Sequence, residues 1–174
     1  MSSLISLPYR VMRVAQAAGA DVYVLGTVKS ACLRYSRYCR QFIPTDVPII
    51  GEAEPRLTAE INRWVSQLGI DMVLPGDVQA TRALIATREA LDAPCFPLPT
   101  LPQFDQLNDK WFFTGLCGEL GLLTPKSWFI ADTAQLRADI DAGRIPLPAI
   151  AKPINHDGSL GVIKLGADDA AAQI

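Results

Sequence analysis

The residues best suited to chemistry lie in one short segment of the chain, Lys152 to Gly161, with the sequence KPINHDGSLG. A lysine closes one apolar stretch, and two glycines and a serine precede the next stretch. Glycines let backbone N–H groups point into a concavity, which is how such loops hold phosphate oxygens. Ser159 adds a hydroxyl donor, and Lys152 adds a point charge suited to a phosphate. The segment fits a phosphate-binding loop; the alternative is a surface hairpin whose glycines serve only the turn.

Lys110 is a second candidate for contact with a phosphate. It follows Asn108 and Asp109, either of which can cap the start of a predicted helix. The helix dipole favours anions in a first turn, so a lysine there opposes the dipole. A lysine that binds a nucleotide phosphate would tolerate this position. The alternative is a solvated surface lysine.

The elements around the loop predict a small α+β unit. Two apolar runs, 148–152 and 161–165, are joined by about eight residues. This connection suits an antiparallel hairpin, because a parallel return needs a dozen residues or more. The aromatic run Trp111 to Phe113 is expected in the core of this unit. Before the hairpin we expect a helix at 109–120, a strand at 127–130 and a helix at 133–142.

The first part of the chain alternates helical and strand patterns. Apolar residues spaced three and four apart predict one buried face on a helix at 4–18, formed by Leu4, Leu7, Val11, Val14 and Ala18. Short apolar runs bounded by glycine suit parallel strands covered on both faces. This alternation predicts an α/β fold with a mostly parallel sheet. Prolines at 94, 97, 99 and 102 predict a boundary near 99–106. The remaining predicted elements are a strand at 21–26, a helix at 55–68 ended by Gly69, a strand at 71–75, a helix at 77–91 and an apolar stretch at 95–98.

The composition excludes several classes of function. The net charge is −2 and the chain has no basic tract, which argues against a nucleic-acid partner. Arg34, Arg37 and Arg40 form the one local basic cluster, which is too small to bind a polymer. No apolar run reaches the ~20 residues of a membrane span, and no secretory signal pattern opens the chain. We therefore expect a cytoplasmic protein without a membrane partner.

The cysteines predict neither disulfides nor a metal site. Cys32, Cys39, Cys95 and Cys117 form no Cys-x-x-Cys pair, and the single His156 cannot complete a zinc site with the usual spacing. We expect free and mostly buried thiols.

Taken together, these motifs resemble the ATP-grasp superfamily, in particular its carbamoyl-phosphate-synthase-like branch. In that family an aspartate-lysine pair opens a helix that leads to a Gly-x-x-x-Pro turn, here Asp109-Lys110 and Gly121 to Pro125. A strand ending in Lys-Pro, a glycine-rich loop and a strand starting Gly-Val follow, here Ala151 to Pro153, Asp157 to Ser159 and Gly161-Val162. The leading part matches more loosely, through residues 19–22, 36–38 and 74–77.

The resemblance implies a Rossmann-like, parallel-sheet pre-ATP-grasp domain at 1–100. The beginning of an ATP-grasp domain, with a small α+β lid, would follow at 101–174. It further implies that Lys110 and Lys152 contact ATP phosphates and that the loop from Asp157 to Gly161 folds over them. The ATP-binding residues implied are Lys110, Lys152, His156, Asp157, Gly158, Ser159 and Gly161.

Other roles follow less directly. Asp77 and Arg82 come after the strand at 71–75, where open α/β sheets place ligands, so a substrate contact is possible there. The alternative for Asp77 is helix capping. Arg37 is expected to be structural. No catalytic residue is assigned, and the residues that bind adenine and magnesium are expected outside this chain, whose two ends both resemble cuts.

The resulting hypothesis is the N-terminal part of an ATP-dependent carboxylate ligase that acts through an acyl phosphate. Its partner would be a small-molecule carboxylate, and a homo-oligomer is possible. We expect the chain alone to be inactive, and the segment Asn155 to Leu160 to be poorly ordered without nucleotide. The alternative is a non-catalytic α/β nucleotide-binding or assembly module. A dinucleotide-dependent enzyme is disfavoured, because no Gly-x-Gly-x-x-Gly follows a strand near the start.

Overall fold

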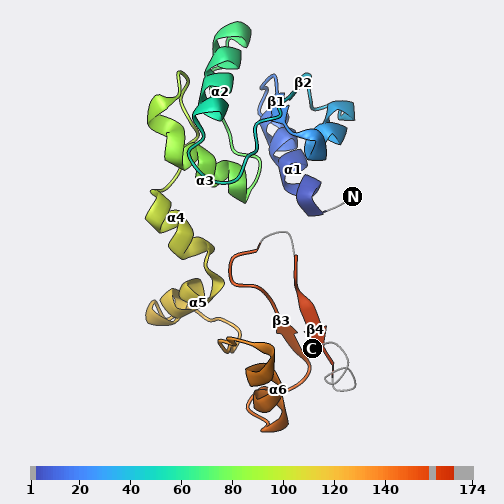
Figure 1. Ribbon diagram of the computed structural model, residues 1–174, viewed down its shortest axis with the longest axis vertical. Coiled ribbons are helices and arrows are strands. Elements are labelled where there is room, and N and C mark those ends of the chain that lie inside the picture. Colours follow the sequence, from blue (N-terminus) through green and yellow to red (C-terminus); the bar gives the residue numbers. More distant parts are fainter. Residues whose placement is uncertain (1–2, 157–159, 167–174) are drawn as a thin grey trace. The chain divides into compact units, whose positions relative to one another are not determined.

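The computed structural model describes residues 3–156 and 160–166, and the chain divides into two units, Met1–Phe104 and Asp105–Ile174 (Figure 1). The expected assignment of 1–100 and 101–174 to two named domains stays a prediction. Three residues of the predicted phosphate-binding loop, 157–159, lie outside the described residues.

The first unit is built around two parallel strands. β1 (Tyr23–Gly26) pairs with β2 (Gln41–Pro44), and the register places Tyr23 opposite Gln41 and Gly26 opposite Pro44. The 3-10 helix η1 (Val28–Tyr35) forms part of the connection between them. A second parallel pairing is a single bridge between Val73 and Cys95. The α/β class is therefore confirmed.

The strand predictions for this unit need two corrections. The apolar stretches at 71–75 and 95–98 contribute one bridged residue each rather than full strands. β2 and η1 were not expected, because Phe42 and Ile43 form an apolar run too short to stand out. Val73 and Cys95 are only partly buried, so the apolar runs there are not enclosed on both faces.

Helices cover the sheet and supply the core of the first unit. The α-helices of this unit are α1 (Ser3–Ala17), α2 (Pro55–Leu68) and α3 (Val78–Thr87). The short 3-10 helix η2 (Arg88–Ala90) follows α3. Val47, Leu57 of α2 and Ala83 of α3 form one buried cluster, and Leu25 of β1 packs against it. Full burial of side chains as large as Val47 or Leu57 stabilises a fold by about 1.5–3 kcal/mol each.

The predicted helices form where their sequence signals indicated, although one buried face was wrong. α2 begins with Pro55 at its first position and ends at Gly69, which adopts φ 64°. In α1 the buried residue is Met12, at 4% exposure, whereas Leu7 and Val14 are 43% and 71% exposed. The apolar spacing therefore identified the helix but not the side that packs.

A helix also occupies the boundary where prolines suggested only a break. α4 (Leu101–Asn108) begins with a capping box, in which the amide of Thr100 donates to Gln103 Oε1 at 3.0 Å. The amide of Gln103 donates in return to Thr100 Oγ1 at 3.4 Å. Pro102 lies in the first helical turn, where a missing N–H costs little. The Thr-x-x-Gln pattern was the signal for this helix.

The second unit contains two further helices and an antiparallel hairpin. α5 (Lys110–Glu119) and α6 (Thr133–Asp141) start after the side-chain caps Asp109 and Asp132. β3 (Ala149–Ala151) pairs antiparallel with β4 (Ile163–Leu165), so the hairpin prediction is confirmed.

Two predictions for the second unit are wrong. Residues 127–130 form no strand, and Phe129 is 46% exposed. The aromatic run Trp111 to Phe113 is not core, since these three side chains are 45%, 44% and 47% exposed. Three consecutive helical positions point about 100° apart, so one buried stripe cannot cover all of them. The buried apolar residues described in this unit are Cys117, Ile145 and Leu165.

Candidate functional site

The start of α5 is fully hydrogen-bonded. Asp109 Oδ1 accepts the amides of Trp111 at 2.9 Å and Phe112 at 2.8 Å. The amide of Lys110 donates to the carbonyl of Ile154 at 3.2 Å. These are the helix amides that have no partner within the helix itself. Because all three amides already donate to an acceptor, an anion at this helix end would bind to the side chain of Lys110 rather than to the amides.

The ammonium of Lys110 reaches the segment that follows β3. Its Nζ donates to the carbonyl of Ile154 at 3.0 Å and to the carbonyl of His156 at 2.6 Å. The structure thus brings together Lys110 and the backbone at His156, two positions selected from the sequence for phosphate contact. These contacts also explain how a lysine is held in a first helical turn, where the dipole disfavours it.

Gly161 closes the other side of this segment. Its φ is +71°, a conformation that L side chains rarely adopt, and a Cβ there would lie 2.7 Å from Pro153 Cγ. Glycine is therefore required for β4 to start so close to Pro153. The side chains of Lys152 and His156 are exposed. Within the described residues Lys152 has no hydrogen bond or ion pair, which leaves its ammonium accessible to a ligand.

Three of the predicted loop residues cannot be placed. Asp157, Gly158 and Ser159 lie outside the described residues. They are also three of the six residues, Asn155 to Leu160, that are predicted to be poorly ordered, and this prediction is not tested. The phosphate-binding roles of these residues stay predictions.

Asp77 in the first unit forms the N-cap of α3. Its Oδ1 accepts the amide of Ala80 at 2.8 Å, and its carbonyl accepts the hydroxyl of Thr81 at 2.7 Å. Arg82 lies on α3 and is partly buried. Its side chain packs close to the backbone of Gly51. The capping alternative for Asp77 is therefore what the structure contains, and a substrate contact by Asp77 or Arg82 stays a prediction.

The basic cluster of the first unit is engaged with aromatic rings. Arg37 donates to the Tyr38 hydroxyl at 2.9 Å, and this hydrogen bond lowers the pKa of Tyr38. The guanidinium of Arg34 lies 5.2 Å from the ring centre of Phe42. Arg40 forms an ion pair with Asp21. Cation–π contacts of this kind stabilise exposed sites by about 0.5–1 kcal/mol, so a structural role accounts for these arginines.

The cysteines are free, as expected, but they are not mostly buried. Cys117 is buried, Cys39 and Cys95 are partly buried, and Cys32 is exposed. Partial burial raises the pKa of the Cys39 and Cys95 thiols, because it disfavours the thiolate. In the described part of the chain, no group of three or more His, Cys, Asp or Glu side chains could hold a metal ion.

Sequence reasoning missed the acceptors of Lys110 because they are backbone carbonyls. A carbonyl carries no residue identity, so neither Ile154 nor its contact with a lysine 44 positions earlier leaves a signal in the sequence. The Lys-Pro motif at Lys152 indicated only the segment in which these acceptors lie.

No helix among the described residues has the length and apolarity needed to cross a membrane.

No protein-family model matches the chain, and no curated protein does. Solved structures do match. The biotin carboxylase domain of the Hydrogenobacter thermophilus 2-oxoglutarate carboxylase aligns with a TM-score of 0.57 and 14% identity, over 94% of this chain and 36% of that one. That structure is a dimer in complex with MgADP, ADP and bicarbonate. The biotin carboxylase domain of a single-chain bacterial carboxylase aligns with a TM-score of 0.52 and 18% identity, over 95% of this chain and 36% of that one.

These similarities establish the fold rather than the activity. The chain spans about a third of the length of the domains it matches, at 36% in both cases. Biotin carboxylase domains are ATP-grasp enzymes. The chain therefore has an α/β fold similar to one portion of these biotin carboxylase domains.

Proposed function

We propose that the chain is the N-terminal part of an ATP-dependent carboxylate ligase, and that its second unit binds the phosphates of ATP. One observation carries the proposal. The ammonium of Lys110 lies within 3.0 Å of two carbonyls in the segment that follows Lys152, and both lysines were selected for phosphate contact from the sequence. The shared fold with a domain solved with MgADP and bicarbonate supports the same class of substrate.

In this proposal the lysines supply positive charge where phosphate charge must be held. Phosphoryl transfer would break the bond between the γ-phosphorus and the ADP oxygen and form a bond to a carboxylate oxygen. A nucleophile then attacks the acyl carbon and expels phosphate. Lys110 and Lys152 would neutralise phosphate charge, which is the main protein contribution to such a reaction.

The finer assignments are also proposals. The Lys152-Pro153 and Gly161-Val162 motifs favour the carbamoyl-phosphate-synthase-like branch, with a small carboxylate as substrate. A homo-oligomer is supported by the dimeric state of one solved neighbour. Magnesium would assist the transfer in the complete enzyme. The described residues of this chain offer no donor cluster that fits it, so no magnesium ligand is assigned here.

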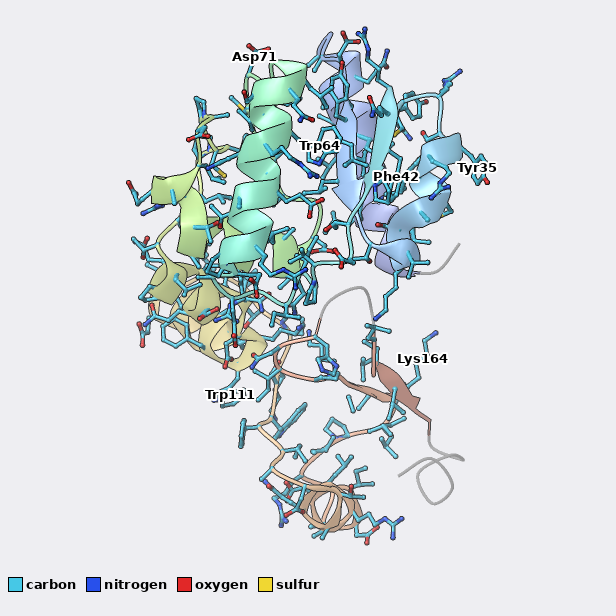
Figure 2. The ribbon with its side chains drawn as sticks, turned by 45° about the horizontal axis from the view of Figure 1, so that its top comes forward. Tyr35, Phe42, Trp64, Asp71, Trp111 and Lys164 are labelled. Atoms are coloured by element: carbon cyan, nitrogen blue, oxygen red, sulfur yellow. The ribbon has the colours of Figure 1, made fainter. Side chains whose placement is uncertain are left out.

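Calorimetric titration with ADP and with a non-hydrolysable ATP analogue tests the proposal. A charge-assisted hydrogen bond contributes about 1–2 kcal/mol, so Lys110→Ala and Lys152→Ala should each weaken binding roughly 5- to 30-fold. Lys164→Ala is the matched control, because Lys164 is exposed on β4 of the same hairpin and projects outward from it (Figure 2). Binding that is insensitive to both substitutions would place the site elsewhere. A complete lack of binding would favour the non-catalytic module.

A further inference from the structure

Helix α1 exposes the apolar side chains that its sequence pattern predicts to be buried. Leu7 and Val14 are two full turns apart, so they lie on the same side of the helix. They are 43% and 71% exposed. Met12, on the opposite side of α1, is buried in the core of the first unit. The core therefore covers one side of α1 and leaves an apolar stripe at Leu7 and Val14 uncovered in this unit.

Two arginines border this stripe. Successive helical residues are rotated by about 100°, which places Arg10 beside Leu7 and Val14, and Arg13 beside Arg10. Both arginines are exposed, and among the described residues neither forms an ion pair. Like charges three residues apart on a helix are neighbours and repel each other. Binding of an anionic group would relieve this repulsion.

A tyrosine pair and a third arginine extend the positive surface. The rings of Tyr9 and Tyr38 pack edge to face, with 5.8 Å between their centres. Arg37 donates to the Tyr38 hydroxyl, and its guanidinium lies 4.9 Å from the centre of the same ring. This hydrogen bond is the main cause of the lowered pKa of Tyr38, and the charge of Arg13 lowers it further. Arg13 and Arg37 therefore act on one tyrosine, and with Arg10 they form a positive edge along the apolar stripe.

The composition of this part of the chain explains why the edge is positive. Residues 1–44 contain six of the 16 basic residues, one of the 18 acidic residues and all four tyrosines. The one acidic residue, Asp21, pairs with Arg40. Arginine and tyrosine are also the residue types that contribute most often to the binding energy of protein–protein interfaces. This concentration of both types points to a protein partner.

We propose that this basic–apolar face, formed by Leu7, Arg10, Arg13, Val14 and Arg37, docks an acidic amphipathic segment of a partner protein. The apolar side chains of the segment pack on Leu7 and Val14. Its carboxylates bind the guanidinium groups, which match a carboxylate with two parallel hydrogen bonds. The inference concerns the first unit and goes beyond the proposed phosphate-binding function of the second.

Three other occupants fit this face less well. A second copy of the chain, related by a twofold axis through the face, would set arginines against arginines. A nucleic acid would use the arginines, but it would leave Leu7 and Val14 uncovered and needs more positive charges for stable binding. A lipid surface binds helices that insert a broad apolar side with large residues, and two aliphatic side chains do not supply one.

Fluorescence anisotropy on the full chain tests the proposal. The probe is a labelled helical peptide with glutamates and leucines on one side, and its control is a scrambled peptide of the same composition. The amphipathic peptide should bind at least about fivefold more tightly, because only its leucines can cover the apolar stripe while its carboxylates meet the arginines. Arg13→Glu should weaken its binding about tenfold, through loss of charge-assisted hydrogen bonds and added repulsion. Val14→Ser should weaken it about threefold through lost apolar contact.

Arg56→Glu is the matched control for the change of charge. Arg56 is an exposed arginine on α2 of the same unit, and its ion pair with Asp46 is long, at 3.7 Å. This variant should change the affinity for the peptide less than about twofold, since a single surface charge away from the contact is worth little. Circular dichroism verifies that each variant is folded, and Arg13→Gln, which removes the charge without reversing it, should give an intermediate loss.

Several outcomes would overturn the proposal. Absence of binding to the wild-type chain, equal affinities for the two peptides, or equal losses in Arg13→Glu and Arg56→Glu would each do so. Tighter binding to a single-stranded RNA, or to vesicles of phosphatidylcholine and phosphatidylserine, would assign the face to those partners instead. Dimerisation seen by light scattering that Arg13→Glu abolishes would assign it to a second copy of the chain.

Discussion

Asp77 and Asp109 perform the same task at the starts of two helices. Each accepts backbone amides through Oδ1, Asp77 from Ala80 and Asp109 from Trp111 and Phe112. From the sequence, Asp77 was as compatible with a substrate contact as with a cap, because an aspartate after a strand suits both. The hydrogen bond to Ala80 accounts for its presence without a ligand.

Loss of the α3 cap should lower stability. Asp77→Ala leaves the amide of Ala80 without its partner and should reduce the free energy of unfolding by about 1 kcal/mol, within the ~0.5–2 kcal/mol range of such caps. Asp77→Asn keeps a capping oxygen and should retain most of the stability. Urea denaturation followed by circular dichroism measures both variants. An unchanged midpoint for Asp77→Ala would show that this cap contributes nothing to stability.

The cysteines should differ in reactivity with pH. Partial burial raises the pKa of Cys39 and Cys95, so less thiolate is present at a given pH and alkylation slows. At pH 7.5 we expect iodoacetamide to label the exposed Cys32 first, with Cys39 and Cys95 following as the pH rises toward 9.5. Peptide mass spectrometry over time gives the order. Equal rates for Cys95 and Cys32 at pH 7.5 would contradict it.

Elements with local signals were predictable, and those that depend on partners were not. The sequence of α2 contains a start signal, Pro55, and a stop signal, Gly69, and the helix forms at the predicted positions. The run 127–130 has strand-forming residues, but a strand exists only where another backbone pairs with it. In the described structure no strand pairs with this run, so the strand is absent. The hairpin of β3 and β4 was predictable because one short loop supplies both strands.

In the candidate site, too, the residues with a local signal could be predicted, and the contacts between them could not. The lysine and glycine positions were visible in the sequence as Lys110, Lys152 and Gly161. The geometry that joins them was not, because the acceptors at Ile154 and His156 are carbonyls set by the path of the backbone. Which residues of α5 are buried was also invisible, since burial depends on the elements that pack around the helix.

Alanine should have opposite effects at Gly118, inside helix α5, and at Gly121, in the turn that follows it. Gly118 lies inside the helix, and a Cβ there would meet nothing within 4 Å. Gly118→Ala should therefore stabilise the protein by up to about 1 kcal/mol. Gly121, just beyond the helix, has a φ of +69° in equally open space. Gly121→Ala should destabilise by about 1 kcal/mol through backbone strain alone. Thermal melting compares the two variants, and equal shifts of the same sign would refute the argument.

At the scale of the whole chain, the two units differ in how much apolar surface they bury. Most of the buried apolar residues described belong to the first unit, including Ile43, Leu57 and Leu84. In the second unit large side chains stay open, among them Trp111 at 45% and Leu123 at 103% exposure.

We also expect that this chain alone does not turn over ATP. In the proposed function Lys110 and Lys152 hold phosphates, but the described residues include no cluster of three or more His, Cys, Asp or Glu side chains that could hold a metal ion. Without a metal the transferring phosphoryl group keeps most of its negative charge, and attack by an anionic carboxylate is disfavoured. Phosphate release from ATP by the purified chain should therefore equal that of buffer, while ADP binding persists. The Lys110→Ala/Lys152→Ala double variant controls for contaminating ATPases. Magnesium-dependent phosphate release that exceeds buffer and disappears in the double variant would show that the chain has a complete catalytic site. Release that survives both substitutions would show that the activity does not depend on these two lysines.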